Sequence, residues 1–308
     1  MPIVCYNIAM KQIEYISADK AADLWTLSER SVRNYCAQGR VIGAIQEGGV
    51  WKIPSNAEKP TRKPRHVKTE STILEILKRE KEAGLKGGLY HRIQIDFTYN
   101  SNHIEGSKLS HDQTRYIFET KTIGMTESAI KVDDILETVN HFRCVDLAIE
   151  GAKTKLTESF IKQLHYILKT GTSDSQKSWF KVGDYKMLEN EVGGSQTAKP
   201  DQVAPQMKDL LADYNSKSQI TFDDILDFHV RFEKIHPFQD GNGRVGRLIM
   251  FKECLKHNII PFIITEELKL FYYRGIREWK NEGGYLRDTC LTAQDEMKEV
   301  LKGFGIKK

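Results

Sequence analysis

A stretch of sequence that cannot pack into a core divides this chain into two parts. Residues 57–68 read AEKPTRKPRHVK, with two prolines, six basic residues counting histidine, and almost nothing apolar. Proline and charge at this density are typical of a linker, because they supply no hydrophobic face. We therefore predict a basic linker over residues 57–70, a small domain over residues 1–56 and a larger domain over residues 71–308.

The net charge of +4 is carried by the N-terminal part of the chain. Residues 1–70 hold 11 Lys and Arg against 7 Asp and Glu, and the rest of the chain's 46 basic and 42 acidic residues balance. A basic module before a neutral body favours an anionic partner for that module. A solvated basic face without a partner explains the same surplus.

The composition is that of an ordinary globular protein, with 40% hydrophobic and 29% charged residues, which excludes wholesale disorder. The longest uncharged apolar stretch, residues 258–265, is far shorter than the roughly 20 residues of a membrane span. The five cysteines lie far apart without a CxxC pair, which argues against a disulfide framework or a zinc ribbon. We expect a cytoplasmic protein with no membrane partner.

Two short helices and a hairpin are predicted in the small domain. Helices over residues 18–25 and 29–37 would each begin after a serine that can cap them, Ser17 and Ser28. A hairpin with its turn at residues 48–49, two glycines, would follow. Two helices at a tight turn and then a hairpin make a helix-turn-helix with a wing.

Residues 15–60 resemble the winged helix-turn-helix modules of the excisionase and MerR type. The resemblance implies that the second helix is a recognition helix in the major groove of duplex DNA. The residues that would face the bases are Arg30, Ser31, Arg33 and Asn34. The alternative is a protein-docking module whose arginines are solvated.

The larger domain is predicted to be mainly α-helical. Proline is sparse, and apolar residues recur at spacings of three and four in residues 71–82, 133–150, 158–168 and 222–235. Residues 182–195 are the exception, because they have glycines near both ends and little helical period, so we predict a hairpin there.

The densest cluster of unusual residues is HPFQDGNGRVGR at residues 236–247. Its glycines satisfy GxGxxG, but a dinucleotide fingerprint must follow a strand, and the apolar residues before this cluster have helical spacing. A second interpretation is a metal site, because His229, Glu233 and His236 would share one helical face. Against it, Pro237 pulls His236 out of regular helix, and the glycines and arginines stay unexplained.

A third interpretation is an anion-binding loop at a helix N-terminus. Residues 241–243 supply backbone N–H groups without side-chain obstruction, and the helical pattern resumes after them. Arg244 and Arg247 would lie near the first turn, where the helix dipole disfavours cations, so a negative ligand should offset them. These two arginines can fork two phosphates of one polyphosphate, and Asp240 beside them predicts a bridging Mg²⁺.

This cluster resembles the signature of the Fic domain, HPFx[D/E]GNGRxxR, and matches it at every specified position. The resemblance covers about residues 90–290 and implies a helical enzyme that transfers AMP from ATP to a protein hydroxyl. It implies that His236 is the general base, that Asp240 holds Mg²⁺, and that Phe238 anchors the loop in the core. The residues implied to bind the nucleotide here are Asp240, Gly241, Asn242, Gly243, Arg244, Gly246 and Arg247.

Two further parts of the site are implied by the resemblance alone. A target-docking flap over residues 181–196 would align an extended segment of the target by main-chain pairing. An element on the adenine side would contain an asparagine, but Lys280 occupies the ungapped position and Asn281 lies one residue on. The residues implied to contact the nucleotide are Asn190, Glu191, Val192, Gly193, Tyr272, Tyr273 and Asn281.

The segment YNSNHIEG at residues 99–106 resembles the family's inhibitory helix, [S/T]xxxE[G/N], through Ser101, Glu105 and Gly106. The resemblance implies an inhibitory helix over about residues 98–107. Its Glu105 would form a bidentate pair with Arg247 and displace the γ-phosphate of ATP. A plainer interpretation, compatible with the first, is that Ser101 caps a short helix that Gly106 ends.

The sequence thus predicts a protein adenylyltransferase that uses ATP and Mg²⁺, modifies a Ser, Thr or Tyr hydroxyl of a target protein or of itself, and is inhibited by Glu105. The alternative is a DNA-binding transcription regulator that senses ATP without transferring AMP. Retention of His236 favours the enzyme, because binding ATP requires no base. The expected partners are the target protein and duplex DNA bound through residues 1–70, and a homodimer is left open.

Overall fold

The computed structural model describes residues 14–60, 71–124, 129–192 and 195–306. The chain divides into two compact units, each with its own hydrophobic core. The first unit comprises residues 1–69 and the second residues 70–308. In the described ranges, no helix is both long enough and apolar enough to cross a membrane.

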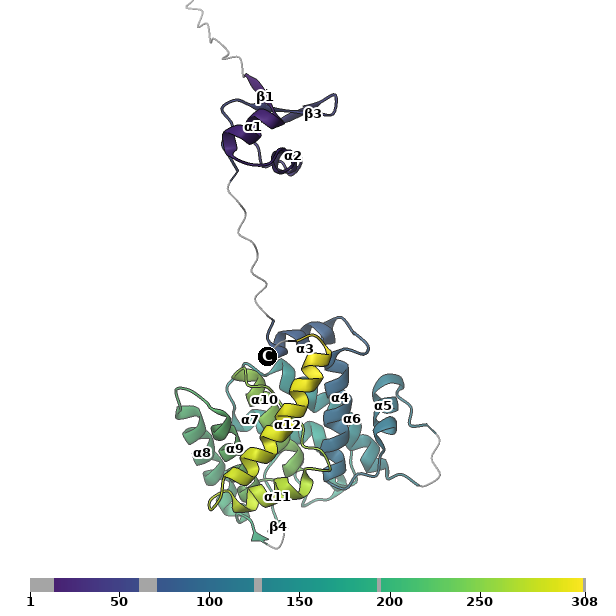
Figure 1. Ribbon diagram of the computed structural model, residues 1–308. Coiled ribbons are helices and arrows are strands. Elements are labelled where there is room, and N and C mark those ends of the chain that lie inside the picture. The colour runs from purple at the N-terminus through teal and green to yellow at the C-terminus, as the bar shows by residue number, and fades with distance from the viewer. Residues whose placement is uncertain (1–13, 61–70, 125–128, 193–194, 307–308) are drawn as a thin grey trace, which may run out of the picture. The chain divides into compact units, whose positions relative to one another are not determined.

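The first unit combines two helices with a three-stranded antiparallel sheet (Figure 1). Its elements are β1 (Tyr15–Ser17), α1 (Ala18–Trp25), α2 (Glu29–Ala37), β2 (Ile45–Glu47) and β3 (Val50–Pro54). The sheet order is β1-β3-β2, and Ile16 lies opposite Ile53, whose side chain is buried against the helices. The Ser28 hydroxyl accepts a hydrogen bond from the Ser31 N–H at 3.3 Å and caps α2 as predicted. Ser17 stands at the start of α1 but makes no side-chain cap bond, so that predicted cap is wrong.

The proposed DNA-facing residues lie on α2. Arg30, Arg33 and Asn34 are exposed, and Arg33 Nη1 lies 3.4 Å from the Glu29 carboxylate. Ser31 is half-buried, with its hydroxyl 2.9 Å from that of Ser28. The order of two helices and a hairpin follows the sequence expectation, whereas the DNA-binding role stays a prediction.

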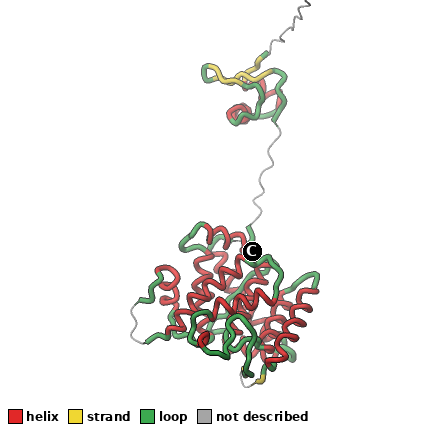
Figure 2. The backbone as a smooth tube through the Cα atoms, turned by 180° about the vertical axis from the view of Figure 1, so that it is seen from behind, coloured by secondary structure: helices red, strands yellow, loops and turns green. Residues whose placement is uncertain are grey.

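The second unit is mainly helical (Figure 2). Its elements in chain order are α3 (Ile73–Glu82), α4 (Leu89–Ile104), α5 (His111–Thr120), α6 (Val132–Glu150), α7 (Glu158–Lys169), a 3₁₀ turn (Asp174–Gln176), β4 (Glu191–Val192), β5 (Ser195–Gln196), α8 (Pro200–Ser216), α9 (Phe222–Ile235), α10 (Asn242–Lys256), α11 (Lys269–Glu278) and α12 (Gly284–Gly303). The four helical segments expected from the periodicity correspond to α3, α6, α7 and α9. Capping boxes at Thr72 and Thr221 fix the starts of α3 and α9.

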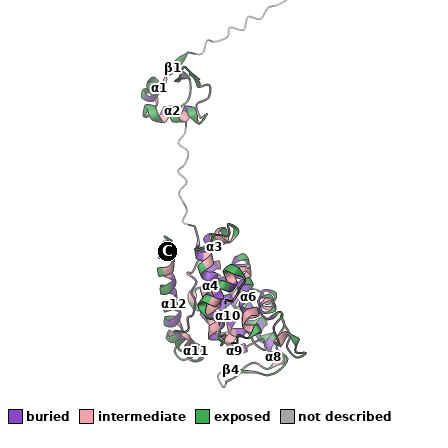
Figure 3. Ribbon diagram, turned by 90° about the vertical axis from the view of Figure 1, so that its right-hand side faces the viewer, coloured by how far each residue is buried: buried purple, intermediate pink, exposed green. Residues whose placement is uncertain are grey.

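Helix α10 runs through the centre of this unit, among α4, α6 and α9 (Figure 3). Nearly all of its residues are buried, which is expected of a helix surrounded by other helices. Charged side chains are buried with the apolar ones. For example, Lys252 Nζ donates to Glu253 Oε1 at 2.6 Å and to the Thr154 carbonyl at 2.8 Å.

The predicted hairpin over residues 182–195 is shorter in the structure. Only β4 and β5 pair, with Glu191 opposite Gln196, and residues 182–190 form turns and bends. The backbone of those residues hydrogen-bonds to the helical body instead of to a partner strand. Gly183 N donates to His165 Nδ1 at 2.9 Å, and Lys186 N donates to the Pro237 carbonyl at 2.9 Å.

Gly275 is expected to be essential for the packing of α11 against α12. A Cβ at this position would lie 2.6 Å from the Leu286 Cα, a backbone atom that cannot swing away. We expect Gly275→Ala to lower the free energy of unfolding by about 1–3 kcal/mol, as overpacking typically does. Urea denaturation measures the change. Gly303→Ala is the matched control, because a Cβ there meets nothing within 4 Å; equal stability of the two variants would contradict the prediction.

Candidate active site

The loop between α9 and α10 brings the signature residues together. His236 ends α9 in a left-handed conformation, with φ of 52°, and its N–H donates to the Phe232 carbonyl at 2.9 Å. Phe238 is buried and stacks on His165, with ring centroids 4.0 Å apart, so its predicted anchoring role is confirmed. Gly241 begins α10 with φ of +82°, a conformation that favours glycine.

Asn242 stabilises this loop through both the oxygen and the nitrogen of its side-chain amide. Its Oδ1 accepts from the Phe238 N–H at 2.8 Å, and its Nδ2 donates to the Phe238 carbonyl at 2.8 Å. The side chain is buried and its polar atoms are used within the loop. In the structure this side chain shapes the turn, and its contact with the nucleotide stays a prediction.

The two glycines inside α10 allow different close approaches. A side chain at Gly243 would overlap the carboxylate of Glu105, which lies against the first turn of the helix. A Cβ at Gly246 would come within 2.7 Å of the Glu233 carboxyl and of the His229 ring. Gly246 therefore permits α9 and α10 to pack, and its nucleotide contact stays a prediction.

Arg247 is buried and is held by the end of α4. Its Nη2 donates to Glu105 Oε1 at 2.7 Å and to the Ser101 carbonyl at 2.9 Å, and its Nε donates to Ser101 Oγ at 3.1 Å. The pair is not bidentate as predicted, and Nη1 has no partner among the described residues. Burial opposes the charged form, but the Glu105 carboxylate outweighs burial and raises the pKa of Arg247.

The segment with the predicted inhibitory motif is the last turn of a long helix. Ser101 lies inside α4 and is buried, so it does not cap a short helix as the plainer interpretation expected. Glu105 is the C-terminal cap of α4. Gly106, with φ of +97°, follows it and ends the helix as expected.

Four side chains form a closed ring of alternating charge beside the loop. Lys169 Nζ lies 2.7 Å from Asp240 Oδ2, and Arg244 Nη2 lies 3.3 Å from the same oxygen. Glu137 closes the ring, because its two carboxylate oxygens pair with Lys169 and Arg244. Burial opposes the ionised form of Asp240, but Arg244 and Lys169 outweigh burial and lower the pKa of this carboxyl.

Sequence reasoning missed Glu137 and Lys169. Each lies in an otherwise regular amphipathic helix, α6 or α7, where a charged residue normally indicates a solvent-facing position. The Lys169 side chain is only 2% exposed. Arg244 is also buried in this ring.

His236 is largely buried, next to Glu233. Its side chain is 15% exposed, and its Nδ1 lies 3.9 Å from Glu233 Oε2. Burial, followed by the nearby Lys186 ammonium, lowers the pKa of His236 to about 4. Burial and the charge of Glu105 raise the pKa of Glu233 to about 8, so this carboxyl is mostly protonated at neutral pH.

The flap joins the loop through side chains at its base. Asn190 Nδ2 donates to the Phe238 carbonyl at 3.1 Å, and Leu188 N donates to Gln239 Oε1 at 3.2 Å. Glu191 and Val192 are exposed on β4. Gly193 lies outside the described residues.

The predicted adenine-side residues are only partly brought to the surface. Tyr272 is buried in a secondary core, with its hydroxyl 2.5 Å from His229 Nε2. Its nucleotide contact stays a prediction. Tyr273 is partly exposed next to Tyr272. Asn281 is exposed, and its amide donates to Glu278 at 3.4 Å; none of its described contacts is with the loop.

The arrangement of acids and histidines limits what metal this site can hold. Among the described residues, no group of three or more His, Cys, Asp and Glu is arranged to hold a metal ion. His229 is occupied by Tyr272, so His229, Glu233 and His236 are not a ligand set. Asp240 is about half exposed, and one carboxylate is the protein contribution that Mg²⁺ takes when phosphates supply other ligands.

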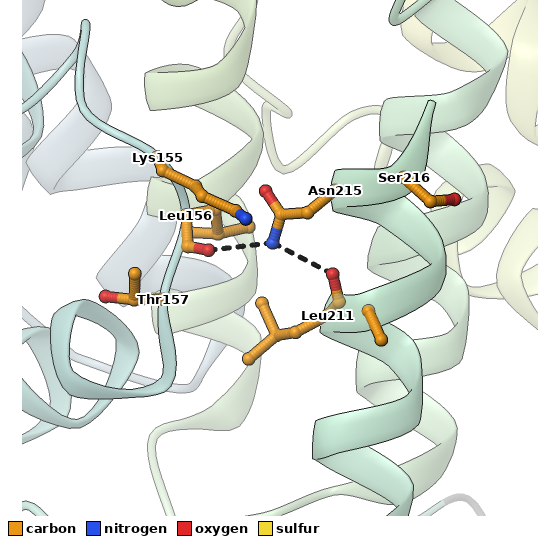
Figure 4. Close-up of a pocket in the computed structure, with 7 residues that line it drawn as sticks. Lys155, Leu156, Thr157, Leu211, Asn215 and Ser216 are labelled. Carbon is orange, nitrogen blue, oxygen red and sulfur yellow. Dashed lines mark hydrogen bonds between the residues drawn. The ribbon is translucent and has the colours of Figure 1, made fainter. Parts of the chain in front are cut away.

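A cavity of about 530 Å³ lies elsewhere, where the start of α7 meets the C-terminal half of α8 (Figure 4). The Asn215 amide there donates to the Leu156 carbonyl at 3.0 Å and to the Leu211 carbonyl at 2.8 Å. The first bond joins α8 to the segment before α7, and the second lies within α8. None of the predicted site residues lines the cavity.

Comparisons with known proteins agree with the sequence resemblance. Residues 155–254 match a sequence model of the Fic/DOC family. The chain is 28% identical over 189 residues to the protein adenylyltransferase fic-1 of Caenorhabditis elegans, covering 58% of this chain and 35% of that protein. It is 28% identical over 193 residues to the protein adenylyltransferase Fic of Drosophila melanogaster, covering 60% and 37%. The chain therefore spans about a third of the length of these curated relatives.

Solved structures show the same fold. A Fic domain-containing signalling protein from Bacteroides thetaiotaomicron has a TM-score of 0.60 at 24% identity, covering 76% of this chain and 98% of that one. A Fic family protein from Desulfovibrio desulfuricans has a TM-score of 0.57 at 22% identity, covering 74% and 71%. The larger unit thus has the mainly helical Fic fold.

His236 is expected to titrate well below an ordinary histidine. Burial disfavours the imidazolium, so the pKa falls from 6.5 to about 4 and the ring stays neutral from pH 6 to pH 8. NMR of the ring Cε1–H signal as a function of pH measures the midpoint, with His236→Gln to assign the signal. The same residue in urea-unfolded protein is the control and should titrate near 6.5. A folded-state midpoint near 6.5 would show that the ring is solvated.

Proposed function

We propose that this chain, a Fic/DOC domain protein distantly related to protein adenylyltransferases, transfers AMP from ATP to a Ser, Thr or Tyr hydroxyl of a target protein or of itself. We further propose that Glu105 inhibits this transfer. The observation that carries both statements is the position of the Glu105 carboxylate, which lies against Gly243 in the first turn of α10 and 2.7 Å from Arg247 Nη2.

The place that Glu105 occupies has the properties of a phosphate site. The first backbone N–H groups of α10 have no partner within the helix, and the helix dipole favours a negative group there. Gly243 leaves room for an acidic oxygen close to the backbone, and Arg247 supplies a buried guanidinium. A γ-phosphate in this place would need Glu105 to withdraw, because one guanidinium cannot bind both fully.

His236 would accept the proton of the target hydroxyl. Its low pKa keeps the ring neutral at physiological pH, so no prior deprotonation is needed. The hydroxyl oxygen then forms a bond to the α-phosphorus while the bond from that phosphorus to the oxygen bridging to the β-phosphate breaks. Pyrophosphate leaves, and AMP remains on the target oxygen.

Asp240 is the residue that would hold Mg²⁺. Its side chain is about half exposed beside the loop, and Lys169 and Arg244 keep it ionised. Bound Mg²⁺ would neutralise charge on the α- and β-phosphates. Arg244 is already paired with Glu137 and Asp240. We therefore assign it the role of orienting Asp240, and not that of binding a phosphate by itself.

The N-terminal unit favours a second role, in DNA binding. Arg30, Arg33 and Asn34 are exposed together on α2, as a recognition helix requires. If the body bound ATP without transferring AMP, the whole chain would be an ATP-sensing regulator. Incubation with α-labelled ATP separates the two functions, because only the enzyme transfers the label to protein.

Glu105→Gly is expected to raise AMP transfer by roughly 10²-fold, the scale of restoring a misaligned reacting group. The rate is measured as incorporation of α-labelled ATP into the protein itself at saturating MgATP. Adding His236→Ala should lower the rate of the Glu105→Gly protein by a factor of ~10²–10⁴, as loss of a general base does. Glu82→Gly, which removes an exposed acid at the end of α3, is the control and should change nothing. Equal rates in the parent and Glu105→Gly would refute inhibition by Glu105.

DNA binding by the full chain is expected to be salt-dependent. Affinity for a random duplex should fall roughly tenfold or more between about 50 mM and 200 mM salt, because phosphate contacts release counterions. Fluorescence anisotropy measures it. Arg30→Ala with Arg33→Ala should weaken binding, whereas Lys20→Ala, an exposed residue of α1, should have little effect. No binding at low salt would favour the protein-docking module.

A further inference from the structure

Lys186 is a buried cation without an acidic partner. The residue is 3% exposed. Among the described residues its ammonium makes no hydrogen bond to a carboxylate, and Glu189 acts on it only through its charge. Its ammonium donates instead to three neutral oxygens: Asn190 Oδ1 at 2.7 Å, Thr197 Oγ1 at 2.6 Å and the Ile235 carbonyl at 3.4 Å. Lysine is rarely buried in this way, because removing its charge from water is costly.

The partners of Lys186 lie at two functional places. Asn190 and Thr197 are the residues immediately outside β4 and β5, at the two ends of the flap hairpin. Ile235 and Pro237 flank His236, and the Lys186 N–H donates to the Pro237 carbonyl at 2.9 Å. Lys186 therefore connects the residues at both ends of the hairpin with the residues on either side of His236.

The charge of Lys186 also acts on His236. Burial lowers the pKa of Lys186 to about 8, and Glu189 partly opposes this. The Lys186 ammonium is the largest cause after burial for the low pKa of His236, against smaller opposing effects of Glu233, Glu105 and Asp240. A neutral side chain of the same length would keep the packing and lose this electrostatic effect.

We propose that Lys186 is a positioning residue that sets the flap hairpin in register with His236, and so aligns the target hydroxyl with the base. The inference rests on the proposed transfer of AMP. When a target segment pairs with the hairpin, the position of the hairpin determines where the target hydroxyl lies relative to His236. That hydroxyl must come within about 2.6–3.2 Å of the base. The nucleotide is held by other residues, so Lys186 should affect transfer more than ATP binding.

The test compares Lys186→Met, Lys186→Arg and the control Lys208→Met, all in the Glu105→Gly protein. Lys208 is an exposed lysine of α8, outside the flap and the loop. Three quantities are measured: self-modification with α-labelled ATP, the Kd for MgATP by calorimetry, and the pH midpoint of His236 by NMR. A misplacement of about 1 Å can cost roughly 10²-fold in rate.

For Lys186→Met we expect self-modification to fall between about tenfold and 10²-fold, with the MgATP Kd within about twofold of the parent. The His236 midpoint should rise by at least about half a unit, because a nearby cation has been removed. Lys186→Arg should restore the midpoint and part of the rate. Lys208→Met should match the parent in all three measurements.

An unchanged His236 midpoint in Lys186→Met, or a loss of rate matched by an equal loss of MgATP affinity, would overturn the proposal. If Lys186→Met does not fold, Thr197→Val removes one hairpin contact and keeps the cation. It should slow transfer at an unchanged His236 midpoint, and an unchanged rate would overturn the proposal. If Glu105→Gly itself transfers no AMP, the proposed function fails, while the His236 midpoints still test the coupling to Lys186.

Discussion

Two guanidinium groups are buried at the start of α10, and the surrounding helices supply the carboxylates that these groups need. Arg244 and Arg247 lie where the helix dipole is unfavourable to cations, and an unpaired buried charge costs several kcal/mol. Carboxylates must therefore reach this end of α10 from elsewhere. Helix α6 supplies Glu137 and the end of α4 supplies Glu105. Segments far apart in sequence thus meet at one helix end through charge, and backbone N–H groups there already favour an anion.

The carboxylates of Glu137 and Glu105 are held differently. The difference makes the ion pair of Glu137 a structural one and that of Glu105 one that a ligand can replace. Glu137 lies within a helix and completes a ring with Lys169, Asp240 and Arg244, so its removal would take one carboxylate from each of two buried cations. Glu105 ends its helix, is followed by a glycine and meets Arg247 through one nitrogen only. In the proposed function, a phosphate replaces Glu105 while the ring stays intact and keeps Asp240 in place.

Several predicted site residues have a structural role that the sequence did not reveal. Asn242 closes the loop, Gly246 allows two helices to pack and Tyr272 fills a core, while their nucleotide contacts stay predictions. In a sequence, a glycine that admits a ligand and a glycine that admits a neighbouring helix look the same. The neighbour is decided by contacts such as that between Gly246 and His229, which no local pattern contains.

The sequence by itself determined the helical class of the larger unit, the extents of α3, α6, α7 and α9 to within about two residues, and the turn at residues 236–241. Each of these follows from interactions within a few residues, such as apolar spacing, capping serines and threonines, Pro237 and Gly241. Only the tertiary structure decided that Lys169 neutralises Asp240, that Lys186 joins the flap to His236, and that Glu105 reaches Arg247. These contacts span between 49 and 142 positions of sequence, and they form because a charge buried by helix packing needs a partner from whichever helix the fold brings beside it.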